Sequence, residues 1–205
     1  MHLIENLDGN MVIRAYTPTT SDETKGHFEL VIKVYFKDVH PKFPEGGKMT
    51  QHLESLNVGD KVKVKGPTGR IQYKGKGKFS VRKDKKSEPV VHEFERIGLI
   101  AGGSGITPMY QLMQAITSDP EDRTQVQLLF ANQSEDDILL RKEIEQMAEQ
   151  HPDRIKFWYT VDRSSPEWTY STGFIDADMI EKHLPAADDK TGIFMCGPTP
   201  MISEF

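Results

Sequence analysis

One short stretch, residues 97–113 (IGLIAGGSGITPMYQLM), constrains the fold of this chain more than any other. Residues 97–101 form an unbroken run that is nearly all apolar, which predicts a short buried strand. Gly102-Gly103-Ser104-Gly105 follows it. Thr107 then suits a helix N-cap, and Pro108 suits the first position of a helix. The sequence therefore predicts a strand, a glycine loop and a helix in direct succession.

This glycine loop has two interpretations. Glycines let backbone N–H groups approach a ligand closely, and a helix N-terminus favours an anion such as a pyrophosphate. The spacing is not the G-x-G-x-x-G fingerprint of dinucleotide-binding folds. A tight turn that packs the strand against the helix, and binds nothing, is therefore an equal alternative.

Composition excludes several classes of protein. The 205 residues carry a net charge of −5, and no apolar run approaches the roughly 20 residues that a membrane helix needs. The N-terminus has no signal-peptide pattern. The single cysteine, Cys196, excludes an intrachain disulfide and fits a reducing compartment, which predicts a location on the cytoplasmic side. No Cys/His cluster has metal-ligand spacing, so we expect no metal site.

Positive charge is concentrated in one segment. Residues 61–86 contain 11 Lys or Arg and one acid, Asp84. Such a run is either a set of solvated strand faces or a basic face for an acidic partner or for phosphates. Its aromatic residues, Tyr73 and Phe79, are few and widely separated, which argues against nucleic acid as the partner.

The first part of the chain is rich in predicted strands. Short apolar or alternating segments bounded by glycine turns predict a small antiparallel barrel, with strands over residues 11–16, 28–36, 61–65 and 70–73. Gly46 and Gly47 lead into a short predicted helix, which gives a second possible anion site. Residues 75–89 are polar and charged, and they predict a linker or a loosely ordered hairpin.

Beyond this segment the pattern changes to alternating strands and helices, which predicts a parallel sheet. The strands are expected over residues 97–101, 126–131, 155–161 and 193–196, and the helices over residues 108–117, 137–150 and 176–183. Residues 134–137 (SEDD) form a plausible capping box for the second helix. Each strand ends in a polar or glycine-rich turn, and ligands bind outside the carboxyl ends of such sheets. We therefore expect a barrel domain over residues 1–80, a linker over 81–96 and an α/β domain over 97–205.

Five motifs occur in the order seen in ferredoxin-reductase-like flavoproteins: RAYTP at 14–18, VIKVY at 31–35, GKMT at 47–50, GGSGITPM at 102–109 and CGPTPM at 196–201. The longer runs VIKVYFKDVHPKFPEGGKMTQHLESL, LLFANQSEDDILLR and FWYTVDR resemble the NADH-cytochrome b5 reductases, and the resemblance covers essentially the whole chain. The flavin domain of nitrate reductases shares RAYTPT and GGSGITPMY and is an alternative. The segment FSVRKDKKSEPVV favours the cytochrome b5 reductases.

The resemblance implies an enzyme with FAD in the barrel and NADH on the second domain. It would take a hydride from NADH onto FAD and pass single electrons to a haem protein, cytochrome b5 or a similar acidic protein. Arg14 would hold a flavin phosphate, Tyr16 would lie on the isoalloxazine, and Thr17 would bond flavin N5, with His2 close by. Further FAD contacts would come from Val34, Tyr35, Gly47, Lys48, Met49 and Thr50. Without the motif, a place in the core would be the more common fate of a residue such as Tyr16.

For NADH, the resemblance implies that the glycine loop passes under the pyrophosphate and that Asp162 accepts the ribose hydroxyls, which favours NADH over NADPH. Cys196 would lie near the nicotinamide and, with Thr17 and His2, makes up the expected catalytic set. The other expected NADH contacts are Lys33, Gly102, Gly103, Gly105, Gly197, Pro198 and Met201, and Thr107 would face both cofactors. From the residues alone, Asp162 could equally cap a turn and Cys196 could be a buried structural cysteine.

The chain departs from the family pattern at Ala15 and Thr199, where the reductases usually have proline. Family members also carry further barrel strands ahead of residue 1 and continue past residue 205. They are often anchored to the endoplasmic reticulum or the mitochondrial outer membrane. The resemblance thus implies a chain that lacks both ends and has no membrane contact of its own. A non-catalytic nucleotide-binding fragment is the alternative from another class.

Overall fold

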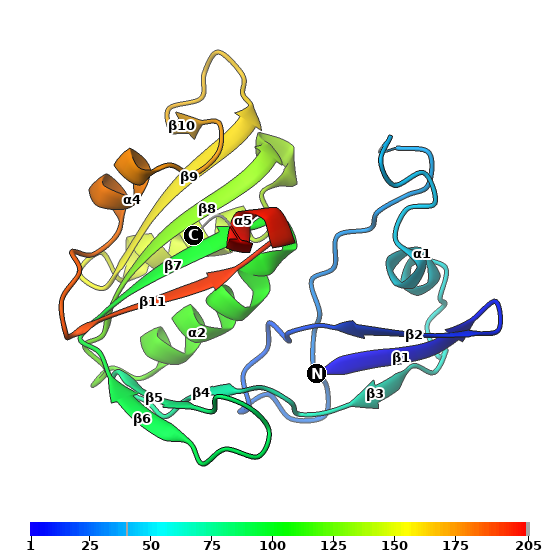
Figure 1. The fold of residues 1–205 in the computed structure, drawn as a ribbon, viewed down its shortest axis with the longest axis horizontal. Helices are drawn as coiled ribbons and strands as arrows, with labels where there is room; N and C mark the ends of the chain where they lie inside the picture. The colour runs from blue at the N-terminus through cyan, green and yellow to red at the C-terminus, as the bar shows by residue number, and fades with distance from the viewer. Residues whose placement is uncertain (40, 204–205) are drawn as a thin grey trace. The chain divides into compact units, whose positions relative to one another are not determined.

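The computed structural model describes residues 1–39 and 41–203. The chain packs into two compact units, Met1–Gly69 and Arg70–Phe205 (Figure 1). Each unit has its own sheet and its own cluster of buried apolar side chains. Among the described residues, no helix is both long enough and apolar enough to cross a membrane.

The first unit is built on an antiparallel sheet with the order β2-β1-β3. Its strands are β1 (His2–Leu7), β2 (Asn10–Ala15) and β3 (Lys63–Lys65). Asp8 and Gly9 join β1 to β2, and both have left-handed backbone conformations, with φ of 52° and 76°. Two left-handed residues form the tight turn that matches the twist of a hairpin. The predicted strands 11–16 and 61–65 correspond to β2 and β3, whereas β1 was not predicted.

A small apolar cluster holds this unit together. Leu3 from β1, Val12 from β2 and Met49 from α1 (Lys48–Glu54) are at most 7% exposed. Met49, the second residue of α1, is therefore buried against the β1–β2 hairpin. This packing fixes the Gly46–Gly47 loop that precedes α1.

The predicted strand over residues 28–36 is wrong. This segment is not a strand in the structure, although it makes isolated backbone bonds such as Thr19 N–H to Glu29 O at 3.0 Å. Within the described residues no neighbouring strand pairs with it along its length. Phe28 and Phe36 are accordingly 46% and 53% exposed. Its apolar pattern indicated a strand, but a strand also needs a partner.

The second unit contains a five-stranded sheet with the order β10-β9-β8-β7-β11, in which every pair is parallel. This confirms the predicted parallel sheet. Four of its strands extend beyond the predicted bounds: β7 (Arg96–Gly102), β8 (Gln125–Ser134), β9 (Ile155–Arg163) and β11 (Thr191–Cys196). The edge strand β10 (Ser171–Thr172) was not predicted.

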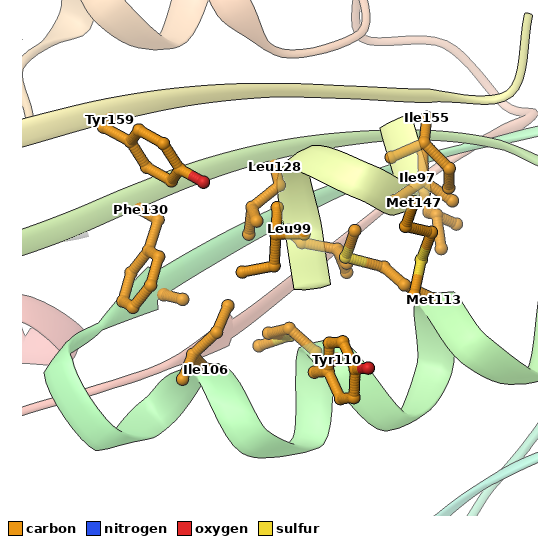
Figure 2. Packing of buried hydrophobic residues seen from close by; sticks show 14 of the residues in the cluster. Ile97, Leu99, Ile106, Tyr110, Met113, Leu128, Phe130, Met147, Ile155 and Tyr159 are labelled. Atoms are coloured by element: carbon orange, nitrogen blue, oxygen red, sulfur yellow. The ribbon is translucent and has the colours of Figure 1, made fainter. Parts of the chain in front are cut away.

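Helices cover both faces of this sheet. The cluster on one face joins β7, β8 and β9 to α2 (Ile106–Ser118) and α3 (Arg141–Gln150); Figure 2 shows Ile106, Tyr110 and Met113 of α2 facing Leu99 and Leu128 of the sheet. On the other face, Ile100 and Leu129 pack with residues of α4 (Ala177–His183) and α5 (Thr199–Ser203). Burial on both faces explains why the central strands are continuous apolar runs.

A second antiparallel sheet belongs to this unit. It has the order β4-β5-β6, with β4 (Ile71–Tyr73), β5 (Lys78–Val81) and β6 (Val90–Glu93). Phe79 of β5 is 1% exposed, and its ring centroid lies 4.7 Å from that of Phe194 in β11. The division at residues 69 and 70 therefore differs from the expected boundary at residue 80. The segment expected to be a linker, 81–96, includes β6 and the start of β7.

Two predicted helix starts differ from the structure. The glycine loop forms a short 3₁₀ helix, η1 (Gly103–Gly105), that runs directly into α2, so Thr107 is the second residue of the helix and not its N-cap. Likewise, the predicted capping box is a separate turn, η2 (Glu135–Asp137). Leu140, with φ of 58°, separates this turn from α3.

Candidate functional site

Two loops that are far apart in sequence pack against each other at the carboxyl edge of the five-stranded sheet. β7 and β11 are neighbours, with Ala101 opposite Cys196. A Cβ atom added at Gly105 would lie 2.1 Å from the carbonyl oxygen of Cys196, and one added at Gly102 would lie 2.8 Å from Cδ of Pro198. No side chain fits at such distances. We refer to residues 102–105 and 196–201 as the paired loops.

The paired loops contain seven of the predicted site residues: Gly102, Gly103, Gly105, Cys196, Gly197, Pro198 and Met201. The side chain of Met201 packs against Gly197, where a Cβ atom would lie 2.4 Å from Cε of Met201. The structure therefore brings together the two motifs that the sequence shows far apart. It also assigns a packing role to most of their glycines.

Gly103 differs from the other glycines of the paired loops. Its φ is +51°, and a Cβ atom there would have no neighbour within 4 Å. Ser104 beside it is exposed. The first turn of α2 contains no acid, and its first N–H, that of Ile106, is bonded to the carbonyl oxygens of Gly103 and Ser104. Gly103 and Ser104 thus form the open side of the loop, where an anion can approach the N-terminus of α2.

The side chains of the predicted residues Thr107 and Cys196 are less exposed to solvent than the open side of the loop. Thr107 is 8% exposed, and its hydroxyl donates to the carbonyl oxygen of Ser104 at 3.3 Å. Cys196 is half-buried, and this burial raises the pKa of its thiol. A raised pKa keeps the thiol neutral near pH 7, and Cys196 packs against the apolar cluster of the sheet, so it does not act as a nucleophile.

Asp162 lies exposed near the carboxyl end of β9. The segment that contains β10 runs parallel to β9 there, and the N–H of Gly173 donates to the carbonyl oxygen of Val161 at 2.9 Å. Phe174 follows and is 83% exposed. Sequence reasoning missed this ring. Its signal was a single aromatic residue in a polar stretch, directly after a glycine.

In the first unit, the structure brings together predicted FAD residues from separate segments. Burial raises the pKa of the half-buried Tyr16, the charge of Arg14 lowers it, and Tyr35 raises it further. Arg14 and Tyr35 are therefore close enough to Tyr16 for electrostatic interaction. The backbone of Tyr16 is fixed by Met1, whose amino group donates to the carbonyl oxygen of Tyr16 at 2.9 Å.

The Gly46–Gly47 loop is attached to Tyr35. The N–H of Gly47 donates to the carbonyl oxygen of Tyr35 at 2.8 Å. Gly46 has φ of +64°, and a Cβ atom there would lie 2.5 Å from the same oxygen. The Thr50 hydroxyl donates to the carbonyl oxygen of Gly47 at 3.0 Å and accepts from the N–H of Tyr35 at 3.2 Å. The loop is thereby held in one conformation.

The residues predicted to contact the cofactors in and before this loop differ in exposure. The side chain of Met49 is 2% exposed and belongs to the apolar cluster, so only its backbone could meet a ligand. The hydroxyl of Thr50 is used within the loop. Lys48 is exposed, whereas Lys33 and Val34 are half-buried in the segment before Tyr35.

His2 and Thr17 lie at the same end of the hairpin. His2 pairs with Ala15, two residues before Thr17, and Thr17 is half-buried. The described contacts give the His2 ring a different partner: Nδ1 of His2 and the hydroxyl of Thr68 are 3.1 Å apart. The predicted proximity of His2 to Thr17 is thus limited to their shared place at the end of β1 and β2.

All 11 basic side chains of residues 61–86 are exposed. Some are in surface ion pairs, such as Lys76 with Glu121 at 3.2 Å and Lys78 with Glu93 at 3.9 Å. The run begins in the first unit and continues into the second. Among residues 1–39 and 41–203, no three His, Cys, Asp or Glu side chains are grouped so that they could hold a metal ion.

Family models match both parts of the chain. Residues 1–73 match the oxidoreductase FAD-binding domain, and residues 99–205 match the oxidoreductase NAD-binding domain. The chain is 54% identical over 202 residues to NADH-cytochrome b5 reductase 2 of Xenopus tropicalis, covering 98% of this chain and 66% of that protein. It is 55% identical over 202 residues to NADH-cytochrome b5 reductase 3 of Rattus norvegicus, covering 98% and 67%. It thus spans about two thirds of the length of these relatives.

Solved structures agree. The cytochrome b5 reductase domain of Ulva prolifera nitrate reductase has a TM-score of 0.92 and 52% identity, covering 98% of this chain and 74% of that one. The CS-b5R domains of human Ncb5or have a TM-score of 0.73 at 24% identity, covering 99% and 54%, and show the fold alone. These matches confirm the predicted fold, a barrel-type FAD part and a parallel-sheet nucleotide part. The chain belongs to the NADH-cytochrome b5 reductase family of oxidoreductases.

Proposed function

We propose that this chain binds FAD and NADH, transfers a hydride from NADH to FAD, and passes single electrons to cytochrome b5. The observation that carries the proposal is the pair of loops at the carboxyl edge of the sheet. Their glycines are closed by packing at residues 102 and 105 and open at Gly103, in the 3₁₀ turn that leads into α2. This open position at the N-terminal end of a helix is where an anion can approach.

The residues of the second unit fit NADH. The open side of Gly103 and the positive N-terminal end of α2 suit a pyrophosphate. Asp162 can accept hydrogen bonds from ribose hydroxyls, and its charge would repel a 2′-phosphate. The exposed ring of Phe174 offers a flat surface for an adenine base. Cys196, held in the paired loops, would orient the nicotinamide.

The residues of the first unit fit FAD. Arg14 is exposed, so its guanidinium can hold a phosphate in a bidentate pair. Tyr16 and Tyr35 provide rings, and the Gly46–Gly47 loop and Lys48 suit the pyrophosphate. Thr17 would donate a hydroxyl hydrogen bond to the flavin. When bound, FAD supplies the acceptor for the hydride and releases electrons singly; the protein supplies binding, orientation and electrostatics.

Two observations support an acidic haem protein as the electron acceptor. The basic residues of 61–86 are all exposed, and the relatives are named as cytochrome b5 reductases. Exposed lysines accelerate encounter with an acidic partner and make the rate depend on salt. We therefore expect reduction of cytochrome b5 to slow as ionic strength rises. The single cysteine suits a reducing compartment, and we place the reaction on the cytoplasmic side.

The Ulva prolifera structure supports a second candidate, because at 52% identity its source is a nitrate reductase. In that case the FAD and NADH chemistry would be the same and the haem acceptor would be a domain of a larger enzyme. A third candidate is a nucleotide-binding fragment without FAD.

The test begins with the purified 205-residue chain and added FAD. We expect quenching of flavin fluorescence, a protein-bound flavin spectrum, and anaerobic bleaching of the flavin band by NADH. Addition of cytochrome b5 should then produce its reduced haem spectrum. A colourless protein that binds ADP-ribose but not FAD would support the fragment. Flavin bleaching without electron transfer to added cytochrome b5 would favour the nitrate-reductase candidate.

A further inference from the structure

An unsatisfied amide lies near the proposed NADH site. Asn132, in the last part of β8, is 8% exposed, and within the described residues neither its Nδ2 nor its Oδ1 has a hydrogen-bond partner. Buried side-chain polar atoms in native proteins are nearly always paired. An amide with both atoms unpaired by the described residues is therefore available to a further hydrogen-bond partner.

The register of the sheet places Asn132 beside the glycine loop. Ala131 pairs with Gly102, so Asn132 follows that pair at the level of Gly103. Side chains alternate along a strand, so Asn132 is on the same face as Leu128 and Phe130. That face is covered by α2, and β8 contacts η1. The amide thus lies beneath the turn that leads into α2.

We propose that Asn132 is a positioning residue for nucleotide binding, and that its amide pairs with the backbone of the glycine loop in the nucleotide-bound state. The amide is enclosed, so a ligand does not reach it directly. The loop above it is tightly packed at Gly102 and Gly105, whereas Gly103 has no neighbour within 4 Å of its Cβ position and η1 has no side-chain cap, so any adjustment is expected at Gly103. A carboxamide has both donors and an acceptor, so it can bond the N–H and the C=O of a peptide group. This inference rests on the proposed function.

The test measures binding of ADP-ribose to the 205-residue chain by calorimetry. Asn132→Leu keeps the branching and the number of side-chain heavy atoms and removes the polar atoms. We expect its affinity for ADP-ribose to fall roughly tenfold, the loss expected for a net hydrogen bond. Its Tm should be equal to or above that of the parent, because replacing an unpaired buried polar group by an apolar one of similar shape does not destabilise the unliganded protein.

Gln114→Leu is the matched control. Gln114 on α2 also has an unpaired buried oxygen, Oε1, while its Nε2 donates to the hydroxyl of Tyr110 at 3.3 Å. It lies beyond the first turn of the helix, away from the glycine loop. Gln114→Leu should leave the affinity for ADP-ribose unchanged within about twofold.

The outcomes separate the two proposals. If the parent chain binds no ADP-ribose, the proposed function fails and this inference fails with it. If the parent binds and Asn132→Leu binds equally well, only the role of Asn132 is refuted. A fall in the Tm of Asn132→Leu by several degrees would also refute it, because the amide would then be paired in the unliganded protein and merely structural.

Discussion

Gly105 and the carbonyl oxygen of Cys196 are in such close contact that a methyl group at residue 105 would lie 2.1 Å from that oxygen. This contact ties the start of α2 to the end of β11. Two of the motifs shared with the family, GGSGITPM and CGPTPM, therefore pack together as one structural unit. The glycine at 105 is required by packing, whereas the glycine at 103 is required by its backbone conformation and leaves open space.

Gly105→Ala and Gly103→Ala should therefore have different effects. The Cβ atom of an alanine at residue 105 would clash with the backbone carbonyl of Cys196. We expect the free energy of unfolding to fall by more than about 3 kcal/mol. Alanine at residue 103 meets no atom, and only the left-handed conformation costs about 1–2 kcal/mol. Urea unfolding of the two variants measures the difference. Equal losses would contradict the close contact at Gly105.

Asp122 should link the β4–β5 hairpin to the main sheet in a pH-dependent way. It is fully buried and accepts bonds from the hydroxyl of Tyr73, the N–H of Lys76 at 2.9 Å and the hydroxyl of Thr124 at 2.6 Å. Burial by itself raises the pKa of Asp122, but the hydrogen bonds from Thr124, Tyr73 and Lys76 outweigh it, so that the pKa lies below its ordinary value. Burial and the bond to Asp122 raise the pKa of Tyr73 to about 12.

A carboxyl group with a lowered pKa stabilises the fold above the pKa of the unfolded chain, about 3.9, and loses that contribution as pH falls through the lower folded value. Asp122→Asn should lower the free energy of unfolding at pH 7 by about 1–3 kcal/mol. It should also lose less stability than the parent between roughly pH 5 and pH 3. Urea titrations across that range test this, with the exposed Asp153→Asn as control. An unchanged acid slope in Asp122→Asn would refute the role.

Local pattern was enough to predict the central part of the second unit. Each buried strand is a continuous apolar run, and glycine marks the end of β7, so the strand, loop and helix could be placed from the sequence. The helix start could not be placed, because the 3₁₀ turn η1 continues directly into α2. No local signal distinguishes that continuation from a cap at Thr107.

Features that depend on distant partners could not be predicted. Residues 28–36 have a strand pattern but no partner strand among the described residues, whereas β1 lacks a strong pattern and is a strand because β2 and β3 flank it. The packing of Phe79 on Phe194 assigns β5 to the second unit. The unpaired amide of Asn132 depends on what surrounds it in three dimensions.

Asp162→Ala should narrow the preference for NADH over NADPH. Asp162 is exposed at the end of β9, so its repulsion of a 2′-phosphate is screened and amounts to about 1 kcal/mol or less, a change of roughly fivefold or less. The measured quantity is the ratio of kcat/KM for the two nucleotides. Asp178→Ala removes an exposed acid from α4 and should leave the ratio unchanged. If Asp162→Ala and Asp178→Ala give the same ratio of kcat/KM for NADH and NADPH, Asp162 does not contact the ribose.

Thr17→Ala should slow reduction of the flavin by NADH while FAD stays bound. A hydroxyl positioned where charge develops stabilises the transition state more than the ground state. Loss of one such donor lowers rates by roughly 10²–10³-fold, and we expect the lower end because the cofactor carries the chemistry. Thr17→Ser keeps the hydroxyl and should keep most of the rate. Stopped-flow bleaching of the flavin band measures both, and a serine variant as slow as alanine would count against this role.

Arg14→Ala should weaken FAD binding without weakening the fold. Arg14 is exposed on β2, and Nη1 donates only to the neighbouring carbonyl oxygen of Ile13, at 2.8 Å. Within the described part of the chain its guanidinium makes no ion pair, so its removal should change the free energy of unfolding by less than about 0.5 kcal/mol. A charge-assisted hydrogen bond to a flavin phosphate is worth about 1.5–3 kcal/mol, so the affinity for FAD should fall by roughly ten- to a hundredfold.

Arg70→Ala is the matched control for this variant. Arg70 is also exposed, and its Nη1 donates to the carbonyl oxygen of Lys83 at 2.8 Å, but it belongs to the second unit. Arg70→Ala changes the net charge by the same amount as Arg14→Ala and should retain FAD. Arg14→Lys should lie between alanine and the parent, because an ammonium keeps the charge but cannot form the bidentate pair. Fluorescence titration with FAD ranks the variants; equal affinities for Arg14→Ala and Arg70→Ala would show that Arg14 does not hold the phosphate.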